Sequence, residues 1–80
     1  MNLNLNQVNL ESITIEFDVH GMIVCAGTYQ LSDVETVIEE QRDEVPSTRV
    51  YLILQYDSGP YEGKLSRIEY EDILFELLYL

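Results

Sequence analysis

The stretch from Arg49 to Tyr56 is the feature that most constrains the fold. It reads Arg-Val-Tyr-Leu-Ile-Leu-Gln-Tyr, and its apolar residues follow one another without the alternation of a half-exposed strand. A short run rich in β-branched and aromatic residues is typical of a strand covered on both faces. We therefore expect the rest of the chain to pack against both sides of this strand.

Two further strands are indicated before it, joined by a tight turn. From Ser12 to Val19, apolar and polar residues alternate strictly, as in a strand with one buried face. His20-Gly21 separates this segment from the apolar run that starts at Met22, which predicts a β-hairpin with glycine at positive φ. Gly27 interrupts the second strand, and we expect a bulge there.

The first ten residues give a weaker pattern. Leu3 and Leu5 share one parity, whereas Val8 and Leu10 share the other. An extra N-terminal strand is therefore an option only if the chain bends or bulges between these pairs.

A helix is predicted between the hairpin and the central strand. Ser32-Asp33-Val34-Glu35 matches a capping box and predicts the start of the helix. Val34, Val37, Ile38 and Val45 mark its inner face, and Pro46 ends it.

The C-terminal part of the chain leaves two interpretations open. Asp57 to Gly63 is rich in turn-forming residues and predicts an exposed loop. Ser66 to Glu69 matches a second capping box, which would start the last helix, but a strand that extends to Glu69 with a later helix start is an alternative. The expected fold is a single α+β domain over residues 1–80. It has a small mixed or antiparallel sheet with two helices on one face, in the order β-β-α-β-(β)-α.

This order, with Asp57, Tyr61 and Gly63 in the loop, resembles the periplasmic domain of the ExbD and TolR transport proteins over Ile13 to Leu78. The resemblance is one of pattern. It implies a similar topology, but the sequence has neither a membrane anchor nor a final strand, so we transfer no function.

Charge and cysteine content restrict the partners and the compartment. Four basic residues against fifteen acidic ones give a formal net charge of −11. Such a surface cannot neutralise phosphates, so we expect no direct binding to nucleic acid or to anionic membranes, and any charged partner should be basic. A single cysteine favours a reducing compartment, and the N-terminus matches neither a signal peptide nor a membrane span, so we expect a cytoplasmic protein.

No group of residues predicts catalysis, a cofactor or a metal. The only histidine, His20, lies in the predicted turn, and Cys25 lies in an apolar run, where a buried inert thiol is expected. The loop that starts at Asp57 has Pro60 and Ile68 at positions that disagree with a calcium loop. We therefore expect a protein that is not an enzyme.

The first predicted helix carries an acidic face, and this face is the candidate partner-binding site. Like charges at i, i+4 cost roughly 0.2–0.5 kcal/mol per pair, so a purely structural helix has no need of them. A face that only keeps the protein soluble is the alternative. The residues of this acidic face are Glu35, Glu39, Glu40, Asp43 and Glu44.

The C-terminal helix carries a second apolar stripe, predicted to comprise Ile68, Phe75 and Tyr79. The N-terminal segment could cover this stripe, or it could form a homodimer interface.

Three functional hypotheses follow. The first is a small acidic inhibitor that occupies the basic surface of a nucleic-acid-binding protein or nuclease, acting as a nucleic-acid mimic. Phage anti-defence proteins of the anti-CRISPR type share its size and charge. The second is a toxin-immunity protein, and the third is a self-associating structural or scaffold protein.

Overall fold

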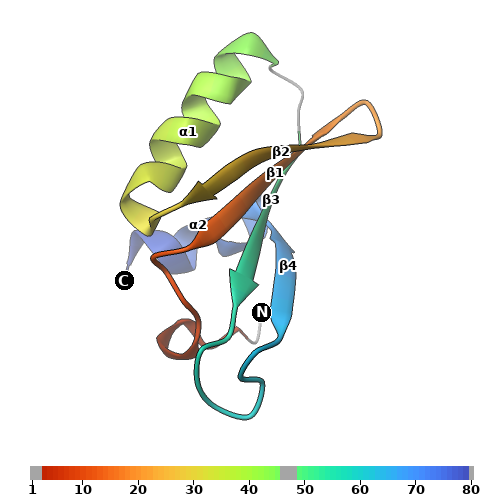
Figure 1. Ribbon diagram of the computed structural model, residues 1–80. Helices are drawn as coiled ribbons and strands as arrows, with labels where there is room; N and C mark the ends of the chain where they lie inside the picture. Colours follow the sequence, from red (N-terminus) through yellow and green to blue (C-terminus); the bar gives the residue numbers. More distant parts are fainter. Residues whose placement is uncertain (1–2, 46–48, 80) are drawn as a thin grey trace.

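The computed structural model describes residues 3–45 and 49–79. Its four strands form one antiparallel sheet in the order β2-β1-β3-β4, and both helices lie on the same side of it (Figure 1). This arrangement confirms the expected α+β fold. The elements in chain order are η1 (Leu5–Gln7), β1 (Ile13–Val19), β2 (Met22–Tyr29), α1 (Leu31–Glu44), β3 (Arg49–Gln55), β4 (Leu65–Glu69) and α2 (Tyr70–Leu78).

One hydrophobic core fills the space between the sheet and the helices. Because side chains alternate between the faces of a strand, every second residue of β1 and β3 points toward the helices. α1 contributes residues four positions apart, as expected for one face of a helix. The buried apolar residues are Val8, Ile13, Ile15, Phe17, Val34, Ile38, Val50, Leu52, Leu54, Tyr70 and Ile73.

The prediction that the Arg49–Tyr56 strand is covered on both faces is wrong. Its helix-facing residues are buried, but Tyr51 and Ile53 on the other face are only half-buried. Both helices occupy the same side of the sheet, so neither covers the second face, where side chains of neighbouring strands shield β3 in part. One of these is Arg67, whose guanidinium carbon lies 3.8 Å from the centre of the Tyr51 ring.

The predicted hairpin is confirmed. His20 and Gly21 have φ angles of 54° and 85°, and the Asp18 carboxylate accepts a hydrogen bond from the Gly21 N–H at 2.8 Å. The bulge is confirmed as well, because the β1–β2 register shifts where Ile15 pairs with Gly27 and Glu16 with Cys25. The hairpin tip projects beyond α1 (Figure 1).

The N-terminal segment forms no regular strand within the described residues. Instead, Leu5–Gln7 is a short 3₁₀ helix whose Asn4 side chain accepts a hydrogen bond from the Asn6 N–H. The buried Val8 then makes an isolated antiparallel bridge with Tyr56. The asparagine side chain favours a local turn over an extended strand.

Both predicted capping boxes are wrong. α1 begins at Leu31 after Gln30, without a side-chain cap, because the Leu31 N–H donates to the Leu10 carbonyl at 2.9 Å. Ser32 therefore lies inside the helix. α1 ends at Glu44, and the predicted stop at Pro46 lies outside the described residues.

The alternative of a strand that reaches Glu69 is confirmed for the C-terminal part. β4 pairs with β3 over five positions, from Tyr51↔Glu69 to Gln55↔Leu65, and α2 starts at Tyr70. A ladder of backbone hydrogen bonds outweighs the single cap that Ser66 could supply. Within residues 3–45 and 49–79, no helix has the length and apolar character needed to span a membrane.

Candidate partner-binding surface

The carboxylates of α1 all lie on the solvent side of the helix. Val34 and Ile38 face the core, which turns the intervening acidic positions outward. Every residue of the predicted acidic face (Glu35, Glu39, Glu40, Asp43 and Glu44) is exposed. The helix is therefore not buried on its charged side, and its acidic face is free to contact a partner.

These carboxylates form two rows along α1. Glu35, Glu39 and Asp43 follow one another at i, i+4 spacing, and Glu40 and Glu44 form the second row. Glu35 and Glu39 lie close enough to Tyr70 of α2 to act on its titration. The first row is therefore next to α2.

The junction of α1 and α2 is built around Tyr70, which is 6% exposed. Burial, followed by the negative charge of Glu35, raises the pKa of the Tyr70 phenol above its ordinary value of 10.0. Arg42 acts in the opposite direction, with its guanidinium carbon 5.9 Å from the ring centre, and it also forms an ion pair with Glu71. The single cation of α1 is thus already engaged by a carboxylate of α2.

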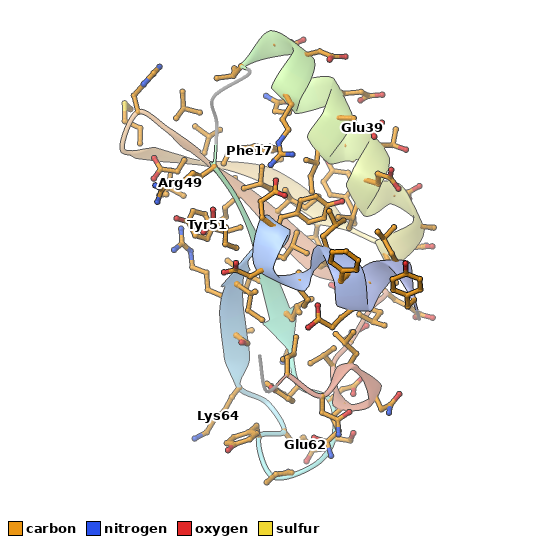
Figure 2. All side chains as sticks on the ribbon, turned by 180° about the vertical axis from the view of Figure 1, so that it is seen from behind. Phe17, Glu39, Arg49, Tyr51, Glu62 and Lys64 are labelled. Carbon is orange, nitrogen blue, oxygen red and sulfur yellow. The ribbon has the colours of Figure 1, made fainter. Side chains whose placement is uncertain are left out.

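The helices hold most of the net charge of the protein. α1 contains six carboxylates and one arginine, and α2 contains three carboxylates and no lysine or arginine, so together they carry eight of the eleven excess negative charges. Figure 2 shows Glu39 on α1 and the cations Arg49 and Lys64 on the opposite side of the view. Nine of the fifteen carboxylates, but only one of the four lysine and arginine residues, therefore lie on the helix layer.

The sheet face opposite the helices has a different chemistry. Arg67 lies over the ring of Tyr51, and its Nε donates to the Glu16 carboxylate at 3.1 Å. Arg49 is exposed at the start of β3. Sequence reasoning missed this cluster, although Arg49 and Tyr51 stand at the parity opposite to the buried residues of β3, which is a signal that places them on the second face.

The three residues predicted for self-association do not form one stripe. Ile68 lies in β4 and packs half-buried against the core, because the strand extends to Glu69. Phe75 and Tyr79 remain 70% and 80% exposed and stack on each other, with ring centres 6.1 Å apart. The N-terminal leucines of the described chain pack against the core and leave these two rings exposed.

His20 and Cys25 lie apart from the helix layer. His20 occupies the hairpin turn, and a shallow hollow there is lined by Asp18, His20, Gly21 and Arg49, without Cys25. Cys25 is exposed, so the expected buried thiol is wrong. The reason is that Cys25 lies on the edge strand β2 and pairs with Glu16, whose side chain is on the sheet face that the helices leave uncovered. Among the described residues, no three histidine, cysteine or acidic side chains are grouped to hold a metal ion.

Comparison with known proteins gives no relative from which a role could be transferred. No family model, no curated protein and no solved structure matches the chain. The functional argument therefore depends on the surface itself.

Proposed function

We propose that this chain is a non-enzymatic, cytoplasmic binding protein that inhibits a nucleic-acid-binding protein or nuclease by occupying its basic surface. The observation that carries the proposal is the concentration of eight of the eleven excess negative charges on the helix layer. The partner-binding carboxylates are Glu35, Glu39, Glu40, Asp43 and Glu44.

The charge density of α1 supports a comparison with nucleic acid. A helix of 14 residues is about 21 Å long, so the five net negative charges of α1 are spaced about 4 Å apart along its axis. One strand of duplex DNA carries a phosphate roughly every 3.4 Å. α1 therefore matches a single strand in linear charge, and a partner groove that binds one strand fits it better than one that surrounds a duplex.

Charge of this kind acts mainly on the rate of association. A gathered set of like charges steers an oppositely charged partner, and the effect falls as the Debye length shortens with salt. The structure offers a matched pair of variants to measure it. Reversing Glu39, Glu40 and Asp43 to lysine changes the helix layer, and reversing Glu11, Asp57 and Glu62 to lysine changes exposed positions outside both helices. Both triple variants have a formal net charge of −5, since three reversals each remove two negative charges from −11.

The experiment captures basic proteins from a lysate of the source organism on the immobilised chain at low salt, and then challenges them with duplex and single-stranded DNA. We expect a nucleic-acid-binding protein that DNA displaces and whose DNA binding the free chain inhibits. The helix-layer variant, with Glu39, Glu40 and Asp43 reversed, should associate with it at least tenfold more slowly. The control variant, with Glu11, Asp57 and Glu62 reversed, should associate at a rate close to that of the wild type. Equal association rates for both variants at low salt would exclude the acidic face of α1.

If the displaced protein proves to be a toxic nuclease, the same surface would make the chain a toxin-immunity protein. A gene for that nuclease beside the gene for this chain would favour this alternative. Its absence, together with a partner from a nucleic-acid-targeting defence system, would favour the anti-CRISPR-like role.

One observation favours a structural or scaffold role instead: the exposed stack of Phe75 and Tyr79. Self-association through these rings predicts a mass that rises with concentration in light scattering. Replacing both residues with serine should then restore a monomer. A wild-type chain that stays monomeric well above micromolar concentrations would discard this role.

A further inference from the structure

A hollow lined mostly by apolar residues, with Ser32 and Glu35 among them, lies between α1 and α2. Its volume is 160 Å³, which is enough for one ring-sized side chain, since apolar cavities of roughly 150 Å³ bind benzene. The hollow is open to solvent on the side of Leu78, which is 58% exposed. The lining residues are Leu31, Ser32, Val34, Glu35, Tyr70, Leu74, Leu77 and Leu78.

The apolar surface continues beyond the hollow along α2. Phe75 in α2 and Tyr79, its C-cap residue, are four positions apart and form the ridge next to that of Leu74 and Leu78. Their rings are stacked and exposed. An exposed apolar ridge beside a hollow is typical of a protein-binding groove.

Carboxylates border this apolar groove and indicate the charge of what enters it. Glu35 is part of the lining, Glu39 lies one turn further along α1, and Glu71 lies at the start of α2. The nearby cation, Arg42, is paired with Glu71. The negative potential at the groove also contributes to the raised pKa of Tyr70.

We propose that the groove between α1 and α2 receives a short basic amphipathic helix of the partner, with one aromatic or leucine side chain in the hollow and lysine or arginine residues against Glu35 and Glu39. The inference rests on the proposed function and adds an apolar anchor to it. A helix fits better than a strand, because the backbone of α1 and α2 is bonded within each helix and offers no edge for strand pairing. On a partner helix, residues three or four apart bring the anchor and its basic neighbours to one face.

The probe for the test is a synthetic amphipathic peptide of about 14 residues, roughly four helical turns, with one phenylalanine, leucines on one face and lysines on the other. A scrambled peptide of the same composition provides the control for charge. Binding is measured by calorimetry and by amide chemical shifts, at low salt and at about 0.5 M NaCl, where the Debye length falls to a few ångströms.

We expect the amphipathic peptide to shift the amide signals of residues 31–35 and 74–78 and to retain binding at high salt. Ser32→Trp, which fills the hollow, and Leu78→Gln should each weaken binding at least tenfold. Leu65→Gln serves as the matched control, because Leu65 is 68% exposed on β4, away from the groove, and it should bind as the wild type does. If circular dichroism shows that Ser32→Trp disturbs α1, the test of the groove depends on the Leu78→Gln variant, whose substituted side chain is exposed.

Equal binding of both peptides, or unchanged binding of the Leu78→Gln variant, would overturn the groove assignment. In that case, the proposed function would still be supported if the wild type captures a DNA-displaced partner and the helix-layer variant associates with that partner more slowly. If no DNA-displaced partner is captured but the peptide binds in the groove, the groove assignment stands and the proposed nucleic-acid mimicry is excluded. Binding of neither peptide would also overturn the groove assignment.

Discussion

At the scale of single residues, Gly27 is a position where both backbone conformation and packing disfavour a side chain. Its φ is 115°, and a Cβ there would lie 3.3 Å from the Tyr29 hydroxyl, which donates to the Ala26 carbonyl at 2.7 Å. We expect Gly27→Ala to lower the free energy of unfolding by about 1–3 kcal/mol, from backbone strain and loss of this hydrogen bond. Urea denaturation measures the loss.

Gly21→Asn is the matched control for Gly27→Ala. Gly21 also has a positive φ, but it has open space around it, and asparagine tolerates this conformation. Its cost should be smaller than that of the Gly27 variant. Equal costs at the two positions would show that the contact with Tyr29 contributes nothing.

Tyr70 gives a prediction for alkaline pH. Burial and the charge of Glu35 raise the pKa of its phenol in the folded protein above the 10.0 of the unfolded chain, so the folded state holds this proton more tightly. The resulting stabilisation is complete below pH 10 and is lost as the pH rises through the folded-state pKa. The stability of the wild type relative to Tyr70→Phe should therefore be constant below about pH 9 and should fall above pH 10.

Urea titrations from neutral pH upward would measure this difference, with Tyr61→Phe as the matched control for loss of one exposed phenol. In a pH titration followed by tyrosinate absorbance, the Tyr70 variant should also lack the component that ionises at the highest pH. A stability difference that does not change with pH would contradict the role assigned to burial.

Sequence patterns at this scale predicted the hairpin and the bulge but failed at both capping boxes. His20-Gly21 and Gly27 are local signals, because positive φ is a property of one residue. Ser32 and Ser66 failed because tertiary contacts supply what a cap would have supplied. Leu31 donates to Leu10, and Ser66 pairs with Leu54 in the sheet. Such contacts between distant segments cannot be read from a four-residue motif.

At the scale of elements, β2 is an edge strand without charge. Met22 to Tyr29 contains no lysine, arginine, aspartate or glutamate, and Met22, Ile23 and Val24 are exposed. Edge strands of this composition tend to pair between molecules unless a charge blocks them. The net charge of −11 opposes the approach of two copies, and this repulsion weakens when salt screens it.

We therefore expect Ile23→Lys to suppress aggregation of the protein at high salt. Ile23 pairs with Asp18, so the new lysine gains a carboxylate neighbour, and the free energy of unfolding should change by no more than about 0.5 kcal/mol. Light scattering over increasing NaCl measures the effect. Thr36→Lys adds the same charge on α1, away from the edge, and a comparable protection by that variant would show that net charge alone is responsible.

The sequence predicted the negative charge of the candidate surface and the helix that carries it, but not the shape of the surface. Periodicity placed Glu35, Glu39 and Asp43 in one row of α1, as observed. Predicting the hollow beside them would have required the position of α2, and that position depends on the end of β4 at Glu69. The stripe that joined Ile68 to Phe75 and Tyr79 failed for the same reason, since helical spacing does not apply across the boundary between a strand and a helix.

At the scale of the whole molecule, the extents of 37, 25 and 21 Å decide how far the charges act on one another. The Debye length is about 30 Å at 0.01 M salt, which spans the fold, and about 8 Å at 0.15 M, which reaches only neighbours on one helix. Salt therefore removes repulsion between elements first. We expect the melting temperature to rise by roughly 4–8 °C over this range, equivalent to about 1 kcal/mol for a domain of this size.

The two triple variants separate net charge from charge placement in this salt response. Both have a formal net charge of −5, and repulsion in an evenly charged globule scales with the square of the charge, so an even distribution would cut the response in both to roughly a fifth. Carboxylates gathered on the helix layer predict a different outcome. Reversal of Glu39, Glu40 and Asp43 should remove most of the rise in melting temperature, whereas reversal of Glu11, Asp57 and Glu62 should leave a larger part of it. Calorimetry in 0.01 M and 0.15 M NaCl measures both, and an equal reduction in the two variants would show that the helix layer has no special share in the repulsion.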